Sequence, residues 1–266
     1  MSGTREANHQ RGTTDLLTVD DITVRFGGVT ALDGVSFTVR EGQVCALIGP
    51  NGAGKTTAFN AISRLVRPAS GRISFAGQDL GHHDAARLSG LGIARTFQNL
   101  ALWPGMTVLE NVMVGAHAKG RVGFASSLLG WPARREDHDL VARAYAMLDY
   151  FGVTDVAHRE CTGLPFGTLK RVELARALIG EPRLLLLDEP AGGLAHGDVR
   201  ELGAVLLRLR DEHDMTILLV EHHMQFVMGI SDYVVALDFG RNLVAGTPAE
   251  LRDSPELVEA YLGTPV

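Results

Sequence analysis

The residues 49–57, "GPNGAGKTT", place glycines, a lysine and two threonines directly after an apolar run. Glycines let several backbone N–H groups converge on one anion, and the N-terminus of a following helix adds positive potential there. The segment matches G-x-x-x-x-G-K-[ST], the pattern of a phosphate-binding loop. A glycine-rich turn with a stray lysine is the alternative. We therefore expect a nucleotide to contact Gly49, Pro50, Asn51, Gly52, Ala53, Gly54, Lys55, Thr56 and Thr57.

Two side chains of this loop predict the kind of nucleotide. Lys55 suits the β and γ phosphates of a triphosphate, because its ammonium group neutralises their charge. The Thr56 hydroxyl suits Mg²⁺, which prefers oxygen ligands. The expected cofactors are therefore ATP and Mg²⁺.

A second apolar run, residues 184–189 ("LLLLDE"), ends in two carboxylates. As a strand of the same parallel sheet, it would bring both carboxylates to the edge at which the phosphate loop lies. Asp188 would then hold Mg²⁺ through a water molecule, and Glu189 would act as general base on an attacking water. The alternative is an acidic pair that caps a helix before Pro190. The phosphate loop favours the catalytic interpretation.

Two kinds of strand must position these groups. Residues 44–49, 184–189 and 216–222 are apolar on both faces, which predicts strands buried in a parallel sheet. Residues 17–26, 35–39 and 73–75 alternate apolar and polar, which predicts half-exposed antiparallel strands. A change of phase at Asp20 and Asp21 indicates a bulge or tight turn.

Helical periodicity at residues 141–151 and 170–179 separates the strands. Between residues 91 and 163 strand signals are scarce, which indicates a helical insert. The fold class is therefore α/β: a parallel core with an antiparallel β subdomain and a helical insert.

Composition excludes several classes of protein. The net charge of -6 argues against a nucleic-acid partner. The two cysteines, Cys45 and Cys161, offer no disulfide framework or metal spacing and predict reduced thiols. No apolar run approaches the ~18–20 residues needed to span a bilayer. Residues 1–15 lack the apolar middle of a secretory signal and predict a disordered polar tail.

Three further features follow in a recognisable order: Gln98 in "RTFQN", residues 164–168 ("LPFGT") and His222 in "LLVEHH". Together with the phosphate loop and the carboxylates, this order resembles the ATP-binding subunit of ABC transporters. The resemblance covers residues 17–262. It implies a P-loop NTPase with a RecA-like parallel sheet core.

The resemblance also implies roles for four residues. Taken alone, Gln98, His222 and Phe26 would be a surface glutamine, a strand-end histidine and a core phenylalanine. Gln98 would act in catalysis, ligate Mg²⁺ and contact a partner subunit, and His222 would hold the γ-phosphate as a catalytic residue. Phe26 would stack on adenine, since ring stacking is permissive. Gly167 would contact the ATP bound to a second ATPase.

The expected domain layout follows from the same resemblance. A tail, residues 1–15, precedes a single ABC ATPase domain, residues 16–266. Residues 16–95 and 164–247 would form the core and the β subdomain. Residues 96–163 would form the helical insert, and residues 248–262 a C-terminal helix.

Within the family, "MTVLENVMVGAH" and the tail from "MGISDYVVAL" to "AYLG" look most like the ATPase of branched-chain amino-acid importers. That likeness implies transmembrane permease subunits, an extracytoplasmic solute-binding protein and a peripheral place on the cytoplasmic face of the membrane. The ATPase of a lipid or lipopolysaccharide exporter is the nearest alternative, because its tail is similar. A non-transport ABC ATPase is the other.

Two positions depart from the family pattern. Pro165 stands where the signature LSGGQ has its serine, so neither a hydroxyl nor an N–H is available for a phosphate. Ala195 stands where an aspartate or asparagine is common. We therefore expect pairing with a second, different ABC ATPase and one dominant hydrolytic site; a homodimer is the alternative.

Overall fold

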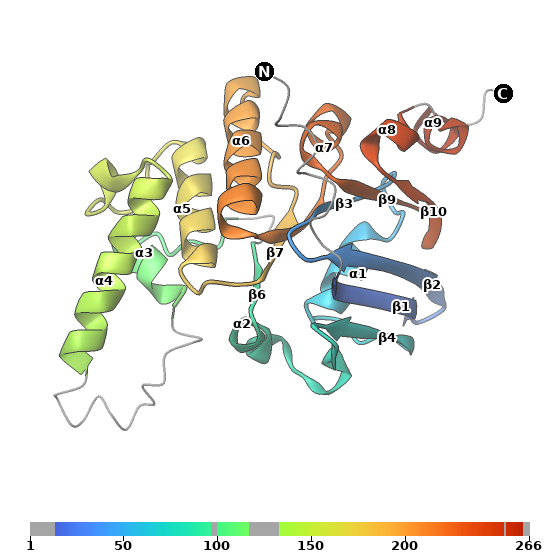
Figure 1. Ribbon diagram of the computed structural model, residues 1–266, viewed down its shortest axis with the longest axis horizontal. Coiled ribbons are helices and arrows are strands. Elements are labelled where there is room, and N and C mark those ends of the chain that lie inside the picture. The colour runs from blue at the N-terminus through green and yellow to red at the C-terminus, as the bar shows by residue number, and fades with distance from the viewer. Residues whose placement is uncertain (1–13, 97–99, 117–132, 253, 263–266) are drawn as a thin grey trace, which may run out of the picture. The chain divides into compact units, whose positions relative to one another are not determined.

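A computed structural model describes residues 14–96, 100–116, 133–252 and 254–262 (Figure 1). Contacts divide the chain into two compact units. The first unit takes the residues up to Ala85 and those from Leu186 onward, and the second unit takes the residues between them. The predicted disordered tail lies almost wholly outside the described residues, and the predicted domain layout stays a prediction.

The first unit holds most of the strands. Its strands are β1 (Asp15–Phe26), β2 (Val29–Arg40), β3 (Val44–Ile48), β4 (Ser70–Phe75), β5 (Gln78–Asp79), β8 (Thr216–Val220), β9 (Tyr233–Asp238), β10 (Arg241–Gly246) and the end of β7 (Leu184–Asp188). Its helices are α1 (Lys55–Ile62), α6 (His196–His213), α7 (Met224–Ile230), α8 (Pro248–Leu251) and α9 (Pro255–Leu262), with a 3-10 turn, η1, at Leu80–His82.

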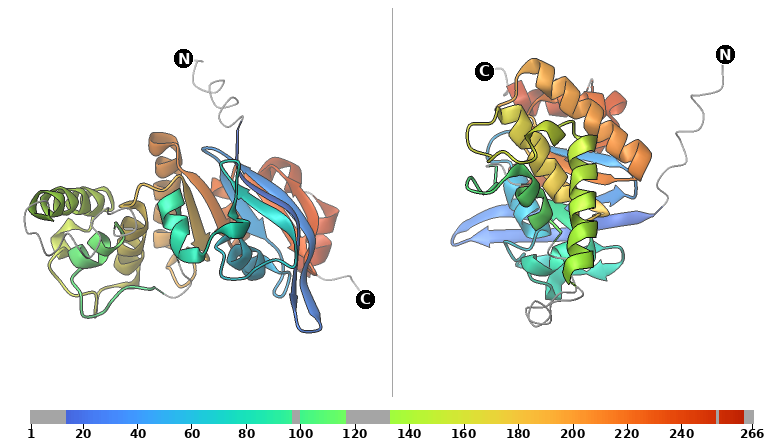
Figure 2. Two further views of the ribbon diagram at one scale, coloured as in Figure 1. Left: turned by 90° about the horizontal axis from the view of Figure 1, so that it is seen from below. Right: turned by 90° about the vertical axis from the view of Figure 1, so that its left-hand side faces the viewer.

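An antiparallel sheet has the strand order β2-β1-β4-β5. β1 and β2 form its long hairpin (blue in Figure 2), and β4 pairs with the other side of β1. The register of β1 shifts between Val19 and Ile22, and Asp21 has a φ of 50°, in the left-handed region. The predicted antiparallel strands and the predicted bulge are therefore confirmed, although β1 runs through the bulge as one strand.

The larger sheet carries the strands that lead to the candidate site. In the first unit its order is β10-β9-β3-β8-β7. β3 pairs in parallel with both β8 and β9, and every residue of β3, β7 and β8 is buried. The prediction of buried parallel strands is confirmed for β3 and β8. β9, which was not among the predicted strands, lies on the other side of β3.

The second unit is mainly helical. It contains η2 (Ala85–Arg87, from its second residue), α2 (Leu88–Leu91), β6 (Ile93–Arg95), α3 (Val108–Val114), α4 (Ala133–Tyr150), η3 (Thr154–Val156) and α5 (Phe166–Leu178). α3, α4 and α5 pack on one another, and Ala144 and Leu148 are buried on the predicted apolar face of α4. Both predicted helices are confirmed, and each begins earlier than its apolar periodicity indicated. None of the helices in the described part of the chain is long and apolar enough to cross a bilayer.

The candidate nucleotide-binding site

The phosphate loop leaves the sheet at Gly49, directly after the last residue of β3. Gly49 has a φ of 146°, and a Cβ there would lie 2.2 Å from the carbonyl oxygen of Leu237. Gly54 has a φ of 100°, and a Cβ there would lie 2.7 Å from a methyl group of Leu32. Both positions therefore require glycine, because a side chain disfavours these positive φ angles and its Cβ would clash with neighbouring atoms.

Lys55 is the first residue of α1 and bends back over the loop. Its Nζ donates to the carbonyl oxygens of Gly49 at 2.6 Å and Pro50 at 2.9 Å. Burial lowers the pKa of Lys55, and the negative charge of Glu189 partly opposes that shift. Thr56 and Asn51 are exposed beside it. A buried cation thus stands inside a glycine-lined loop with polar groups open to solvent, which suits a polyphosphate.

The carboxylates lie at the ends of β7 and in the turn after it. Asp188 is the buried last residue of β7. Glu189 follows with a φ of 47°, which is uncommon for a residue with a side chain, and its N–H donates to Val220 at the end of β8. His222 lies just beyond β8, with its Nδ1 4.0 Å from an Oε1 of Glu189. The structure therefore brings together Glu189 and His222, which the sequence separates widely.

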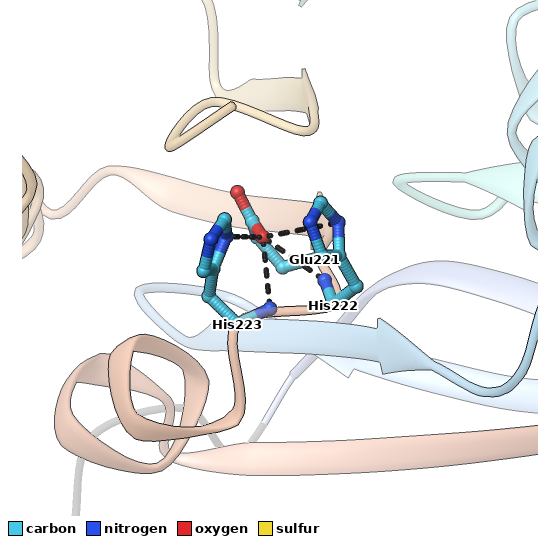
Figure 3. A group of neighbouring side chains, drawn as sticks. All are labelled: Glu221, His222 and His223. Carbon is cyan, nitrogen blue, oxygen red and sulfur yellow. Dashed lines mark hydrogen bonds and ion pairs between the residues drawn. The ribbon is translucent and has the colours of Figure 1, made fainter. Parts of the chain in front are cut away.

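Glu221 is a residue of this site that sequence reasoning missed. Its side chain is fully buried between His222 and His223 (Figure 3). One carboxylate oxygen accepts the N–H of Ala191 at 2.8 Å. The other accepts the N–H groups of His222 at 2.9 Å and His223 at 3.2 Å. Glu221 therefore joins the segment after Glu189 to the segment that carries His222.

Glu221, His222 and His223 could also share a metal ion, since their ligand atoms lie within 4.8 Å of one another. Both carboxylate oxygens of Glu221 already accept backbone N–H groups, and His223 Nδ1 lies 3.2 Å from one of them. An ion would have to displace these bonds, so the group fits a structural anchor better. For Mg²⁺, the oxygen donors Thr56 and Asp188 are the better set.

We expect Glu221→Gln to lower the free energy of unfolding by about 1.5–3 kcal/mol, because an amide nitrogen cannot accept the N–H groups that the carboxylate holds. Chemical denaturation of the full chain measures this loss. Glu212→Gln, the same change at an exposed position of α6, should shift it by less than about 0.5 kcal/mol. Equal stability of the two variants would contradict the anchoring role.

The remaining predicted site residues are placed as follows. Gln98 lies outside the described residues. Phe26 ends β1 with about half of its surface exposed, so its ring is open to a stacking partner. Gly167 lies in the first turn of α5, in the second unit, after Pro165 as the N-cap residue. That N-cap provides no side-chain hydrogen bond, so Pro165 leaves the helix start without a capping side chain.

A family model described as "ABC transporter" matches residues 32–192. The chain therefore belongs to the ABC transporter family, in which it is an ATP-binding subunit with a nucleotide-binding P-loop fold. LivG of Salmonella typhimurium, a high-affinity branched-chain amino acid transport ATP-binding protein, is 41% identical over 249 residues, which are 93% of this chain and 98% of that protein. BraF of Pseudomonas aeruginosa, described in the same words, is 40% identical over the same shares of the two chains.

Solved structures agree with this assignment. A nucleotide-free ATP-binding cassette of an ABC transporter superposes with a TM-score of 0.82 at 30% identity, over 94% of this chain and 100% of that one. The ADP conformation of an ATP-binding cassette superposes with a TM-score of 0.81 at 31% identity, over 95% and 100%. The fold class predicted from sequence and the family resemblance are confirmed.

Proposed function

We propose that this chain binds and hydrolyses Mg·ATP and thereby drives the uptake of branched-chain amino acids through separate membrane subunits. The observation that carries the proposal is the meeting of Glu189 and His222 at one edge of the sheet whose strand β3 ends in the phosphate loop. A binding module without hydrolysis would not require a general base at that point.

Each proposed site residue would have its own role in the reaction. Lys55 and the N–H groups of the loop would hold the β and γ phosphates, with Phe26 stacked on the adenine. Thr56, Gln98 and, through water, Asp188 would hold Mg²⁺, which neutralises the charge that develops on the phosphates. Glu189 would take a proton from the attacking water, and His222 would orient the γ-phosphate.

The solute is inferred from the relatives. Both LivG and BraF are named for high-affinity branched-chain amino acid transport, and each aligns with nearly the whole of this chain. Because an ATP-binding subunit carries no path for the solute, we infer permease partners and a solute-binding protein outside the membrane. The chain would then be peripheral, on the cytoplasmic face.

The second unit offers a surface for such a permease. Trp103 is exposed over 45% of its surface, although its backbone N–H donates to the side chain of Asn111 and its ring lies under the guanidinium group of Arg176. Leu100 and Leu102 are partly exposed beside it. The segment thus packs partly within its own unit and leaves apolar surface exposed, which a membrane subunit could contact.

We further infer pairing with a different ABC ATPase. The segment at Pro165 begins α5 without a capping side chain, and Phe166 is exposed next to it. Ala195 is likewise the N-cap of α6 and makes no side-chain hydrogen bond, where Asp or Asn would make one. A partner with a complete signature would give this chain's ATP the contacts that this chain cannot return, and a homodimer would lack them at both sites.

The test is reconstitution of the chain with its permease and binding-protein partners in liposomes that contain ATP. We expect leucine, isoleucine and valine to accumulate on the side of the ATPase and to stimulate phosphate release. Liposomes without ATP are the control. ATP-dependent release of a lipid or lipopolysaccharide in place of amino-acid uptake would support the exporter alternative, and phosphate release that no membrane partner changes would support a non-transport ATPase.

A further inference from the structure

The N–H of Gly49 has an unusual partner. Gly49 is buried and lies one residue beyond the end of β3. A buried backbone N–H requires an acceptor. This one donates to the phenol oxygen of Tyr261 at 2.8 Å, a residue near the end of α9 and 212 positions further along the chain. The first residue of the phosphate loop is therefore held by the C-terminal helix.

The position of α9 follows from the sheet that carries the loop. Ser254 caps α9 by accepting the N–H of Leu257, and the Leu257 side chain is buried. α9 packs beside β10 (red in Figure 1), β10 pairs with β9, and β9 pairs with β3. The phenol thus reaches Gly49 from a helix that packs against β10, which is two strands away from β3 in the same sheet.

The hydrogen bond completes the restraint on the Gly49 backbone. The carbonyl oxygen of Gly49 accepts Lys55 Nζ at 2.6 Å, and its Cα is close to the backbone of Leu237. Beyond this point, loop residues such as Asn51 and Gly52 and residues of α9 both line a cavity of about 630 Å³. The loop and α9 are therefore not packed along their whole length, and the phenol is a point contact that sets the direction of one peptide group.

Burial raises the pKa of Tyr261, and the N–H of Gly49 partly opposes that shift. The phenol is therefore neutral at physiological pH and accepts the hydrogen bond as a hydroxyl group. Because it is a neutral group, its removal changes no charge next to the phosphates. If removing the phenol lowers nucleotide affinity, the cause is therefore a change in the shape of the phosphate loop and not a change in charge.

We propose that Tyr261 is a positioning residue of the nucleotide-binding site: its phenol oxygen fixes the Gly49 peptide so that the phosphate loop has its binding shape before the nucleotide arrives. The proposal rests on nucleotide binding by the loop, and it extends the site to the last helix of the chain. It assigns a role to α9 that the family motifs do not contain.

The test compares Tyr261→Phe with the parent full chain. We expect the affinities for ADP and Mg·ATP, measured by calorimetry, to fall about three- to tenfold, the effect of one neutral hydrogen bond. We expect kcat to stay within about twofold while KM for ATP rises, because the chemical groups remain. In ¹⁵N-labelled protein without nucleotide, the Gly49 amide should exchange with solvent faster.

Tyr233→Phe is the matched control, since it removes a phenol oxygen from β9 in the same sheet without touching the loop. It should leave affinity and Gly49 exchange unchanged. The proposal is overturned if Tyr261→Phe binds nucleotide as the parent does, or if kcat falls with KM unchanged. 3-Fluorotyrosine at position 261, which keeps the ring and the reach of the side chain but is a weaker acceptor, keeps the test usable should the phenylalanine variant unfold, and it should lower the affinity by a smaller factor. A parent chain that binds no nucleotide would instead refute the proposed function, whereas Gly49 exchange would still test the hydrogen bond.

Discussion

Glu189→Gln is expected to reduce ATP hydrolysis by about 10²–10⁴-fold while nucleotide affinity stays at the parent level or rises. The amide keeps the size and the hydrogen-bonding oxygen of the carboxylate but cannot take a proton from water, and a positioned general base contributes a factor of that order. Lys55 and the loop remain, so the phosphates are still held. Phosphate release at saturating Mg·ATP and calorimetric affinity measure the two effects separately.

Glu212→Gln is the control for this experiment, because it makes the same chemical change on the exposed end of α6. Parent-like turnover in Glu189→Gln would exclude Glu189 as the base. In the assembled transporter, the equivalent change should be made in each ATPase in turn. We expect the change in this chain to reduce hydrolysis more, since its sequence contains every catalytic residue proposed above, whereas Pro165 replaces the serine of the signature that it offers to its partner. Equal losses would refute the inferred asymmetry.

The sequence predicts those parts of the site in which one short segment contains both the chemical groups and the residues that determine its local structure. The loop at residues 49–57 combines the phosphate-binding types with the glycines that its backbone requires at Gly49 and Gly54. The runs that form β3 and β8 are apolar on both faces because both faces of these strands are buried. In these cases a short stretch of residues contains the whole physical reason for its structure.

The parts that sequence could not predict depend on pairing between distant segments. The left-handed backbone of Glu189 cannot be predicted from its residue type, because the turn is held by the hydrogen bond from its N–H to the carbonyl oxygen of Val220. In the sequence, Glu221 is simply a polar residue after a strand. Its anchoring role becomes visible only in the fold, where it accepts the N–H of Ala191. The contact of Tyr261 with Gly49 requires the order of β10, β9 and β3, which no local pattern contains.

Lys55→Ala is expected to weaken Mg·ATP binding by about 100-fold, because the variant loses the cation that the loop surrounds, and hydrogen bonds to charged groups are worth about 1.5–3 kcal/mol each. The same side chain holds the carbonyl oxygens of Gly49 and Pro50, so the variant without nucleotide should also unfold at a lower temperature. The rise in Tm on adding Mg·ATP separates the two effects, since it depends only on binding to the folded state.

For the parent, nucleotide at a hundred times its Kd should stabilise the fold by about 2.7 kcal/mol, and for Lys55→Ala the same concentration should give well under about 1 kcal/mol. Arg67→Ala, which removes a cation from an exposed ion pair with Asp84, should keep the full ligand-induced rise. The rise separates loss of the binding cation from general loss of stability, because a variant that is only less stable keeps its ligand-dependent increment. If Lys55→Ala kept that increment, the phosphates would have to be held without the lysine, and the loop would not be the nucleotide site.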